Sequence, residues 1–115
     1  MIVSNEAEVR ATPVESSEAS RVAMKVLISA TEGWEDHVMR VLEVEPGGYT
    51  PRHAHDWPHI NYMISGSGTL LMDGRETPVS AGSYALVPAG MEHQFQNTGD
   101  EVFRFICIVP ERGHY

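Results

Sequence analysis

The sequence has little cysteine, few basic side chains and no long apolar run, and each shortage excludes a class of protein. Among its 115 residues, Cys107 is the only cysteine, so the chain cannot form an internal disulfide. Eight Lys and Arg against 16 Asp and Glu give a net charge of −8, which argues against nucleic acid or an anionic membrane as the main partner. No apolar stretch approaches the roughly 20 residues of a membrane-spanning helix.

The N-terminus also lacks the features of a secretory signal. Residues 1–8 carry acidic rather than basic side chains and contain no apolar core. Together with the single cysteine, this favours a reducing, cytoplasmic location. The length and the 42% hydrophobic content are typical of one globular domain with one core, so we expect residues 1–115 to form a single domain.

The chain divides into an N-terminal segment, residues 1–20, and a body. The segment is acidic and weakly periodic, which is typical of chain that is either loosely ordered or held by a neighbouring element. The apolar run from Val22 to Ile28 predicts a strand. Such a strand can pair with its own sheet or with the edge of a partner subunit.

From residue 37 onward, short β-prone segments separated by Gly and Pro predict an all-β fold. No helical period extends over more than two turns, and Asp73-Gly74 is typical of a tight type I′ hairpin. About eight short strands favour a jelly-roll barrel. We expect them at about 37–45, 50–55, 59–65, 68–73, 76–79, 83–87, 92–97 and 101–109.

Alternation along two of these strands predicts which side chains face the interior. In the strand at 37–45, Arg40 shares a face with Val38, Leu42 and Val44. It either pairs with a carboxylate at the barrel rim or anchors an anionic ligand through its fork of donors.

The strand at 101–109 places Phe105 and Cys107 inside, with Phe103 and Val109, and leaves Arg104 to solvent. Cys107 is then a small buried filler, or a thiol prone to oxidation if a redox metal lies nearby.

Three histidines lie within seven residues, in His53-Ala54-His55-Asp56-Trp57-Pro58-His59. Residues two apart in extended chain point to the same side, so His53 and His55 would face one way together. Two imidazoles on one face, with a third after a short turn, are what a transition-metal site requires. A single buried histidine is more often a hydrogen-bonded core residue, but that explanation suits one ring better than several.

Two ordered patterns cover most of the body. They are Gly47-x5-His53-x-His55-x3-His59-x6-Gly66 and Gly82-x5-Pro88-x-Gly90-x2-His93-x3-Asn97. They resemble the two signature motifs of the cupin superfamily, and the resemblance extends over about residues 37–111. It implies an all-β double-stranded β-helix, or jelly-roll barrel, built around a metal.

The third ligand position of cupins is most often glutamate, whereas this chain has His59. The sequence is similar to small single-domain cupins with four histidine ligands, in which the run His-x-His-x-Trp-x-His recurs and is completed here by Trp57. The resemblance implies that one divalent transition metal is bound, with Mn or Fe as plausible native metals and Ni, Zn or Cu as alternatives. The implied ligands are His53, His55, His59 and His93, and the implied substrate pocket contains Arg40, Trp57, Met63, Phe105 and Cys107. His37 and His114 fit neither motif.

Four neutral imidazoles leave the charge of a divalent metal uncompensated, which favours anionic ligands. Our leading hypothesis is therefore a metal-dependent dioxygenase, an oxidoreductase acting on a small anionic or enolisable substrate that Arg40 orients. The alternatives are a metal-dependent isomerase, decarboxylase or hydrolase without redox chemistry, and a sensor that binds a small molecule without turnover. Asp56 and Glu92 flank the ligands, but strand parity points both away. Cupins of this size are commonly homodimers, so we expect a homodimer.

Overall fold

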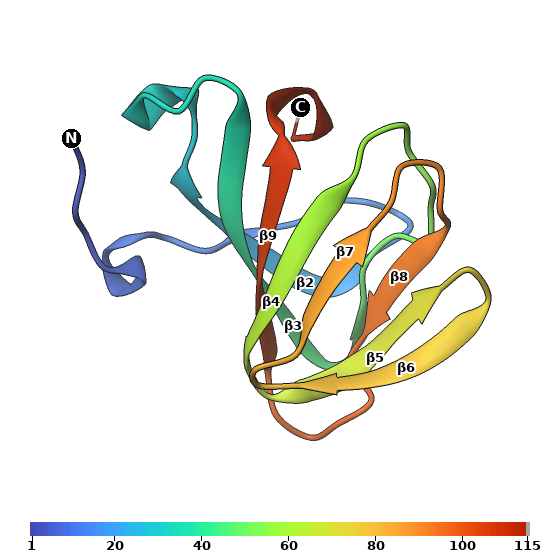
Figure 1. The fold of residues 1–115 in the computed structure, drawn as a ribbon. Coiled ribbons are helices and arrows are strands. Elements are labelled where there is room, and N and C mark those ends of the chain that lie inside the picture. The colour runs from blue at the N-terminus through green and yellow to red at the C-terminus, as the bar shows by residue number, and fades with distance from the viewer. Residues whose placement is uncertain (115) are drawn as a thin grey trace.

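The protein is a curled antiparallel β sheet, described here for residues 1–114 in a computed structural model (Figure 1). The strand order is β6-β5-β8-β3-β9-β4-β7, and β2 pairs with β1 and β3 beside this path. The all-β jelly-roll expectation is confirmed. The strands are β1 (Thr12–Pro13), β2 (Ser20–Ile28), β3 (His37–Tyr49), β4 (His59–Ser65), β5 (Ser67–Met72), β6 (Arg75–Ser80), β7 (Tyr84–Val87), β8 (His93–Gln96) and β9 (Phe103–Pro110).

Three single-turn 3-10 helices accompany the sheet: η1 (Glu6–Glu8), η2 (Ala30–Glu32) and η3 (Glu111–Gly113). Within residues 1–114, no helix has the length and apolar character needed to cross a membrane.

The strand expected at 50–55 is absent, and the strand before it is longer than expected. Pro46-Gly47-Gly48 does not end β3, which continues to Tyr49. A register shift against β2, between the pairs Val22↔Val44 and Ser20↔Tyr49, absorbs the extra residues as a bulge. Residues 50–58 therefore form a loop, and its only ladder contact in the described chain is an isolated bridge between His53 and His93.

The hairpin expected at Asp73-Gly74 is confirmed. It joins β5 to β6 through the closing pair Met72↔Arg75. Asp73 and Gly74 have φ values of 52° and 75°, as a type I′ turn requires.

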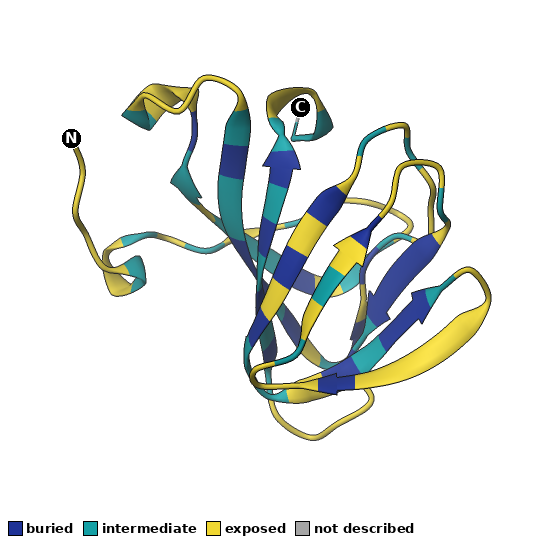
Figure 2. Ribbon diagram, viewed as in Figure 1, coloured by how far each residue is buried: buried dark blue, intermediate teal, exposed yellow. Residues whose placement is uncertain are grey.

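The core lies on the concave side of the curled sheet, where the banding along β9 marks alternate buried residues (Figure 2). Phe103, Phe105, Cys107 and Val109 are all buried, which confirms the face predicted for the last strand. The rings of Phe95 and Phe105 stack with their centroids 4.3 Å apart. These two rings line the same cavity as the histidines of the two motifs.

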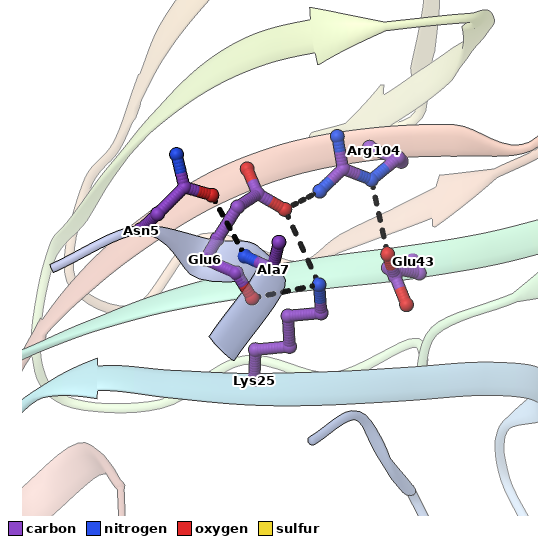
Figure 3. A network of polar contacts seen from close by, with 6 residues as sticks. All are labelled: Asn5, Glu6, Ala7, Lys25, Glu43 and Arg104. Atoms are coloured by element: carbon purple, nitrogen blue, oxygen red, sulfur yellow. Dashed lines mark hydrogen bonds and ion pairs between the residues drawn. The ribbon is translucent and has the colours of Figure 1, made fainter. Parts of the chain in front are cut away.

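The first turn of the N-terminal segment, η1, is attached to the outward side of β2 and β9 (Figure 3), whereas Val14 of the same segment packs against the core. The Glu6 carboxylate forms ion pairs with Lys25 on β2 and Arg104 on β9. Arg104 Nε also donates to Glu43 Oε2 at 3.0 Å. Arg104 was expected to face solvent; it does lie on the outward side, but η1 covers it and its side chain is only 22% exposed.

The strand predicted at Val22–Ile28 is β2, and it pairs with β3 of the same chain from Ser20 to Ile28. Of the two alternatives that the sequence allowed, pairing within its own sheet is the one observed.

Replacing Glu6 by alanine should lower the free energy of unfolding by about 1 kcal/mol, because the substitution removes the acceptor shared by two partly buried cations. Urea unfolding followed by circular dichroism measures the change. Glu8→Ala, on the same turn but exposed, is the matched control and should leave the midpoint unchanged. Equal midpoints for both variants would show that the network does not hold the segment.

Candidate metal centre

The four motif histidines come together at one end of the curled sheet. His53 and His55 lie on the loop after β3, His59 begins β4, and His93 begins β8. Ring nitrogens of His53, His55 and His93 lie within 4.8 Å of one another. His59 joins them through His93, with the two Nε2 atoms 3.0 Å apart.

Backbone hydrogen bonds hold the loop against β8. His53 N donates to His93 O at 3.2 Å, and His93 N donates back to His53 O at 3.0 Å. Thr50 N donates to Phe95 O at 2.9 Å, and Gly90 N donates to His55 O at 2.7 Å. The two sequence motifs are therefore joined by main-chain contacts, which do not depend on a metal.

Three of the four rings are oriented by an oxygen acceptor. Each acceptor lies within 2.9 Å of Nδ1: Trp57 O for His55, Met91 O for His93, and Asn61 Oδ1 for His59. Asn61 Nδ2 donates to Ile106 O at 3.3 Å, which fixes the amide with its oxygen toward His59. A proton held on Nδ1 leaves the Nε2 lone pair free for a metal.

Burial keeps these imidazoles neutral. It is the largest cause in lowering the pKa of His53, His55 and His59, and it lowers the pKa of His93 to about 4. Repulsion between the neighbouring rings acts in the same direction for His53 and His93. The deprotonated form that a metal ligand needs is therefore the resting form of the cluster.

The contact between His59 and His93 fits a metal better than it fits a hydrogen bond. With Nδ1 of each ring donating elsewhere, both Nε2 atoms present lone pairs to each other at 3.0 Å. Two nitrogens bound at right angles to one metal, each about 2.1 Å from it, would lie about 3.0 Å apart. The donor set therefore suits a divalent transition metal.

The histidines line a cavity of about 200 Å³. Its apolar wall is made by Val22, Met24, Leu42, Phe95, Phe105 and Val109. Arg40 and Cys107 also line it, and Arg40 Nη2 donates to Cys107 Sγ at 3.1 Å. Arg40 Nε is buried without a hydrogen-bond partner among the described residues. This guanidinium is the donor that an anionic ligand in the cavity would meet.

Met63 does not lie where the sequence placed it. It was expected on the cavity wall with Trp57 and Phe105, but it is fully buried in the core and does not belong to the described lining. Its neighbour in register on β9 is Phe105, which does line the cavity. Trp57, Phe105, Arg40 and Cys107 do line the cavity.

The two acidic residues next to the ligands point away from the cavity. Glu92 pairs with Arg52 at the exposed surface, with a separation of 2.9 Å, and Asp56 is exposed. Among the described lining residues there is no Asp or Glu. The cavity is therefore free of negative charge, although the whole chain carries −8.

A contact from the end of the sheet, which sequence reasoning missed, holds one of the clustered histidines in place. The Trp57 ring stacks on His55 with centroids 4.4 Å apart and an interplanar angle of 7°. Gly113 of η3 lies so close that an added Cβ would clash with Nε1 of Trp57. Glu111 N anchors η3 by donating to Asp36 O at 3.0 Å. No local pattern around Gly113 signals this contact, whereas Asn61 could have been found because it lies two residues after His59 on the same strand face.

The chain is similar to known proteins with several different activities. The family model of the cupin domain matches residues 40–109. The structure of the polyketide cyclase RemF from Streptomyces resistomycificus has a TM-score of 0.91 and 30% identity, covering 96% of this chain and 80% of that one.

Two curated relatives have other activities. The oxalate-binding protein of Thermotoga maritima is 26% identical over 69 residues, which are 59% of this chain and 57% of that protein. Gentisate 1,2-dioxygenase of a Ralstonia species is 28% identical over 65 residues, 56% of this chain and 18% of the enzyme. The matches thus span less than two thirds of either curated relative.

Replacing Gly113 by alanine should weaken metal binding about tenfold, since Trp57 must move and the ring stacked on it, His55, loses its support. Titration of the metal-free protein with Co²⁺, followed by visible absorption and tryptophan fluorescence, measures the effect. Glu111→Ala is the matched control on the same turn, and a His53→Ala/His55→Ala variant sets the level of no binding. Unchanged Co²⁺ affinity and spectrum in Gly113→Ala would contradict this role for the turn.

Proposed function

The chain belongs to the cupin domain family, and from this premise we propose that it is a metal-dependent enzyme acting on an anionic, enolisable carbonyl compound. The observation that carries the proposal is the combination of clustered neutral histidines with Arg40 in a cavity whose described lining has no carboxylate. A divalent metal there keeps its full positive charge, and Arg40 adds another. An enolate or carboxylate is the ligand that such a cavity favours.

In this proposal the metal has four ligands, His53, His55, His59 and His93. The contact between the Nε2 atoms of His59 and His93, at 3.0 Å, supports the inclusion of His59. Manganese or iron are the metals we favour, and the imidazole donors also suit nickel, zinc or copper. When bound, the metal would act as a Lewis acid that makes a neighbouring C–H group more acidic.

The chain's own residues would bind and orient the substrate. The unpartnered Nε of Arg40 would donate to an enolate or carboxylate oxygen. Cys107, the register partner of Arg40 on β9, holds the guanidinium in place by accepting a hydrogen bond from Nη2. Phe95, Phe105 and Leu42 would pack against the carbon chain and exclude water.

Cyclisation without redox chemistry is the reaction we favour. In a poly-β-carbonyl compound, loss of a C–H proton gives an enolate whose carbon forms a bond to a second carbonyl carbon of the same molecule. The oxygen of that carbonyl takes up a proton, and water can leave afterwards. The 30% identity to a polyketide cyclase over 96% of this chain supports this choice.

Dioxygenation of a similar substrate is the second candidate. An octahedral metal held by the four histidines would have two open positions, which would suffice for substrate and O₂ together. The likeness to gentisate 1,2-dioxygenase supports it, although it covers 18% of that enzyme. Binding without turnover is the third possibility, and the likeness to an oxalate-binding protein supports it.

We further propose that the protein works as a homodimer in the cytoplasm. The support for a reducing compartment is the buried free thiol of Cys107, which lies 3.8 Å from Nδ1 of His59 and would be exposed to oxidation beside a redox metal.

The reaction is tested with 3,5,7-trioxooctanoate, a short poly-β-carbonyl carboxylate whose C2 can close a six-membered ring on the C7 carbonyl, added to Mn- and Fe-loaded protein with and without O₂. Ring product formed at equal rates in both conditions is the expected result. Arg40→Met should retain the metal but lose at least tenfold in kcat/KM, because the anion loses its donor. Stoichiometric O₂ uptake would favour dioxygenation, and tight binding without product would favour the sensor.

Replacing His59 by glutamate should keep the metal and weaken anion binding by about tenfold or more, because a carboxylate ligand lowers the net charge of the site by one. Calorimetric titration of acetylacetone into the Mn-loaded wild type and variant measures this. His59→Gln, which is neutral, is the control that separates charge from size. Equal affinities in wild type and His59→Glu would refute the electrostatic argument.

A further inference from the structure

An apolar area covers the convex face of β9, β4 and β7, opposite the cavity. The strand registers set its side chains in two parallel rows across the three strands: Leu86, Ile60 and Ile108 in one, and Tyr84, Tyr62 and Ile106 in the other. Along β4, exposed bands alternate with buried ones (Figure 2). We call these six residues the outer face.

The outer face is exposed to an extent that is unusual for such large apolar side chains. Ile60 and Tyr62 are each 50% exposed, Leu86 is 60% exposed and Tyr84 is 84% exposed. Shallow hollows run over both rows, and no Asp, Glu, Lys or Arg belongs to their described lining. An uncharged area of this kind on a chain of net charge −8 is typical of a contact surface.

This chain covers the other part of the same convex side but leaves the outer face open. The turn η1 lies over β2, β3 and β9 through the ion pairs of Glu6 with Lys25 and Arg104 (Figure 3). Val41, on the convex side of β3, is 1% exposed, whereas Tyr84 on β7 is 84% exposed.

The area is close to what one side of a stable dimer needs. At about 200 Å² for a fully exposed large side chain, the exposed fractions of the four residues amount to roughly 500 Å². Ile106, Ile108 and the partly exposed Trp34 beside the second hollow add to this. A standard interface takes about 800 Å² from each partner.

Charge points to a second copy of the chain as the occupant. A partner recognised by charge would need ionised groups on the outer face, and its described lining has none. Two copies of an acidic chain repel each other over most of their surfaces, so they can approach closely only where that surface is neutral. With a two-fold axis between the two rows, the row that contains Tyr84 and Tyr62 in one copy would pack on the row that contains Leu86 in the other copy.

We propose that the outer face, formed by β4, β7 and β9, is the interface of a homodimer related by a two-fold axis. This assignment rests on the homodimer inferred above and replaces pairing through the edge of β2 with packing through the face of the sheet. The cavities then open away from the interface, so each copy keeps a complete site.

The oligomeric state of the full chain is measured by light scattering after gel filtration and by sedimentation equilibrium. The chain concentration is varied from 10 to 100 μM, about the range in which weak dimers dissociate. We expect the wild type at twice the 12.7 kDa chain mass. Leu86→Lys and Tyr84→Lys place a charge in the interface and should each raise the dissociation constant at least 100-fold. Thr77→Lys adds the same charge at an exposed residue of β6 and should leave the dimer intact.

Circular dichroism and Co²⁺ binding are measured on every variant, so that loss of fold and loss of the metal site are distinguished from loss of the dimer. Monomeric Leu86→Lys and Tyr84→Lys that bind Co²⁺ like the wild type would support the outer face. A wild-type monomer would overturn the dimer and its interface together. A dimer that persists in both lysine variants would overturn the interface, and dissociation of Thr77→Lys would do the same; none of these results touches the proposed reaction.

Discussion

The paired backbone hydrogen bonds between His53 and His93 are the contact on which the rest of the site depends. They join the loop after β3 to the first residue of β8, and so bring the two halves of the histidine cluster together. The side chains follow from this contact, because the two rings start from paired backbone positions. Positions on loops are generally held less precisely than positions on strands, and these main-chain bonds reduce that disadvantage for His53 and His55.

Charge is distributed differently over the outer surface of the protein and inside the cavity. Acidic residues lie on the outside, where Glu6 attaches the N-terminal segment, Glu43 pairs with Arg104 and Glu92 pairs with Arg52. The cavity holds neutral rings and one guanidinium. An interior more positive than its surroundings would attract anions by contrast with the acidic surface.

Much of the fold could be predicted from local pattern, and the site only in part. Alternation placed Arg40 and Cys107 on inward faces, because a period of two depends on neighbouring residues alone. Alternation could not show how deeply a side chain is buried: Met63 faces inward as well, but it is fully buried and lies outside the described lining of the cavity. The support that Gly113 gives to the ligands comes from another part of the chain, which no spacing rule covers. The bulge that carries β3 through Pro46-Gly47-Gly48 likewise depends on its partner strand.

The pairing of β3 with β9, from His37↔Pro110 to Val44↔Phe103, has a consequence for how the protein matures. These strands are distant in sequence, and closing so long a loop is a slow event in folding. Arg40 has its partner Cys107 only after β9 has been synthesised and has paired. His53, His55 and His59 all precede β9 in the chain, so the cavity that they line is completed only when the last strand pairs.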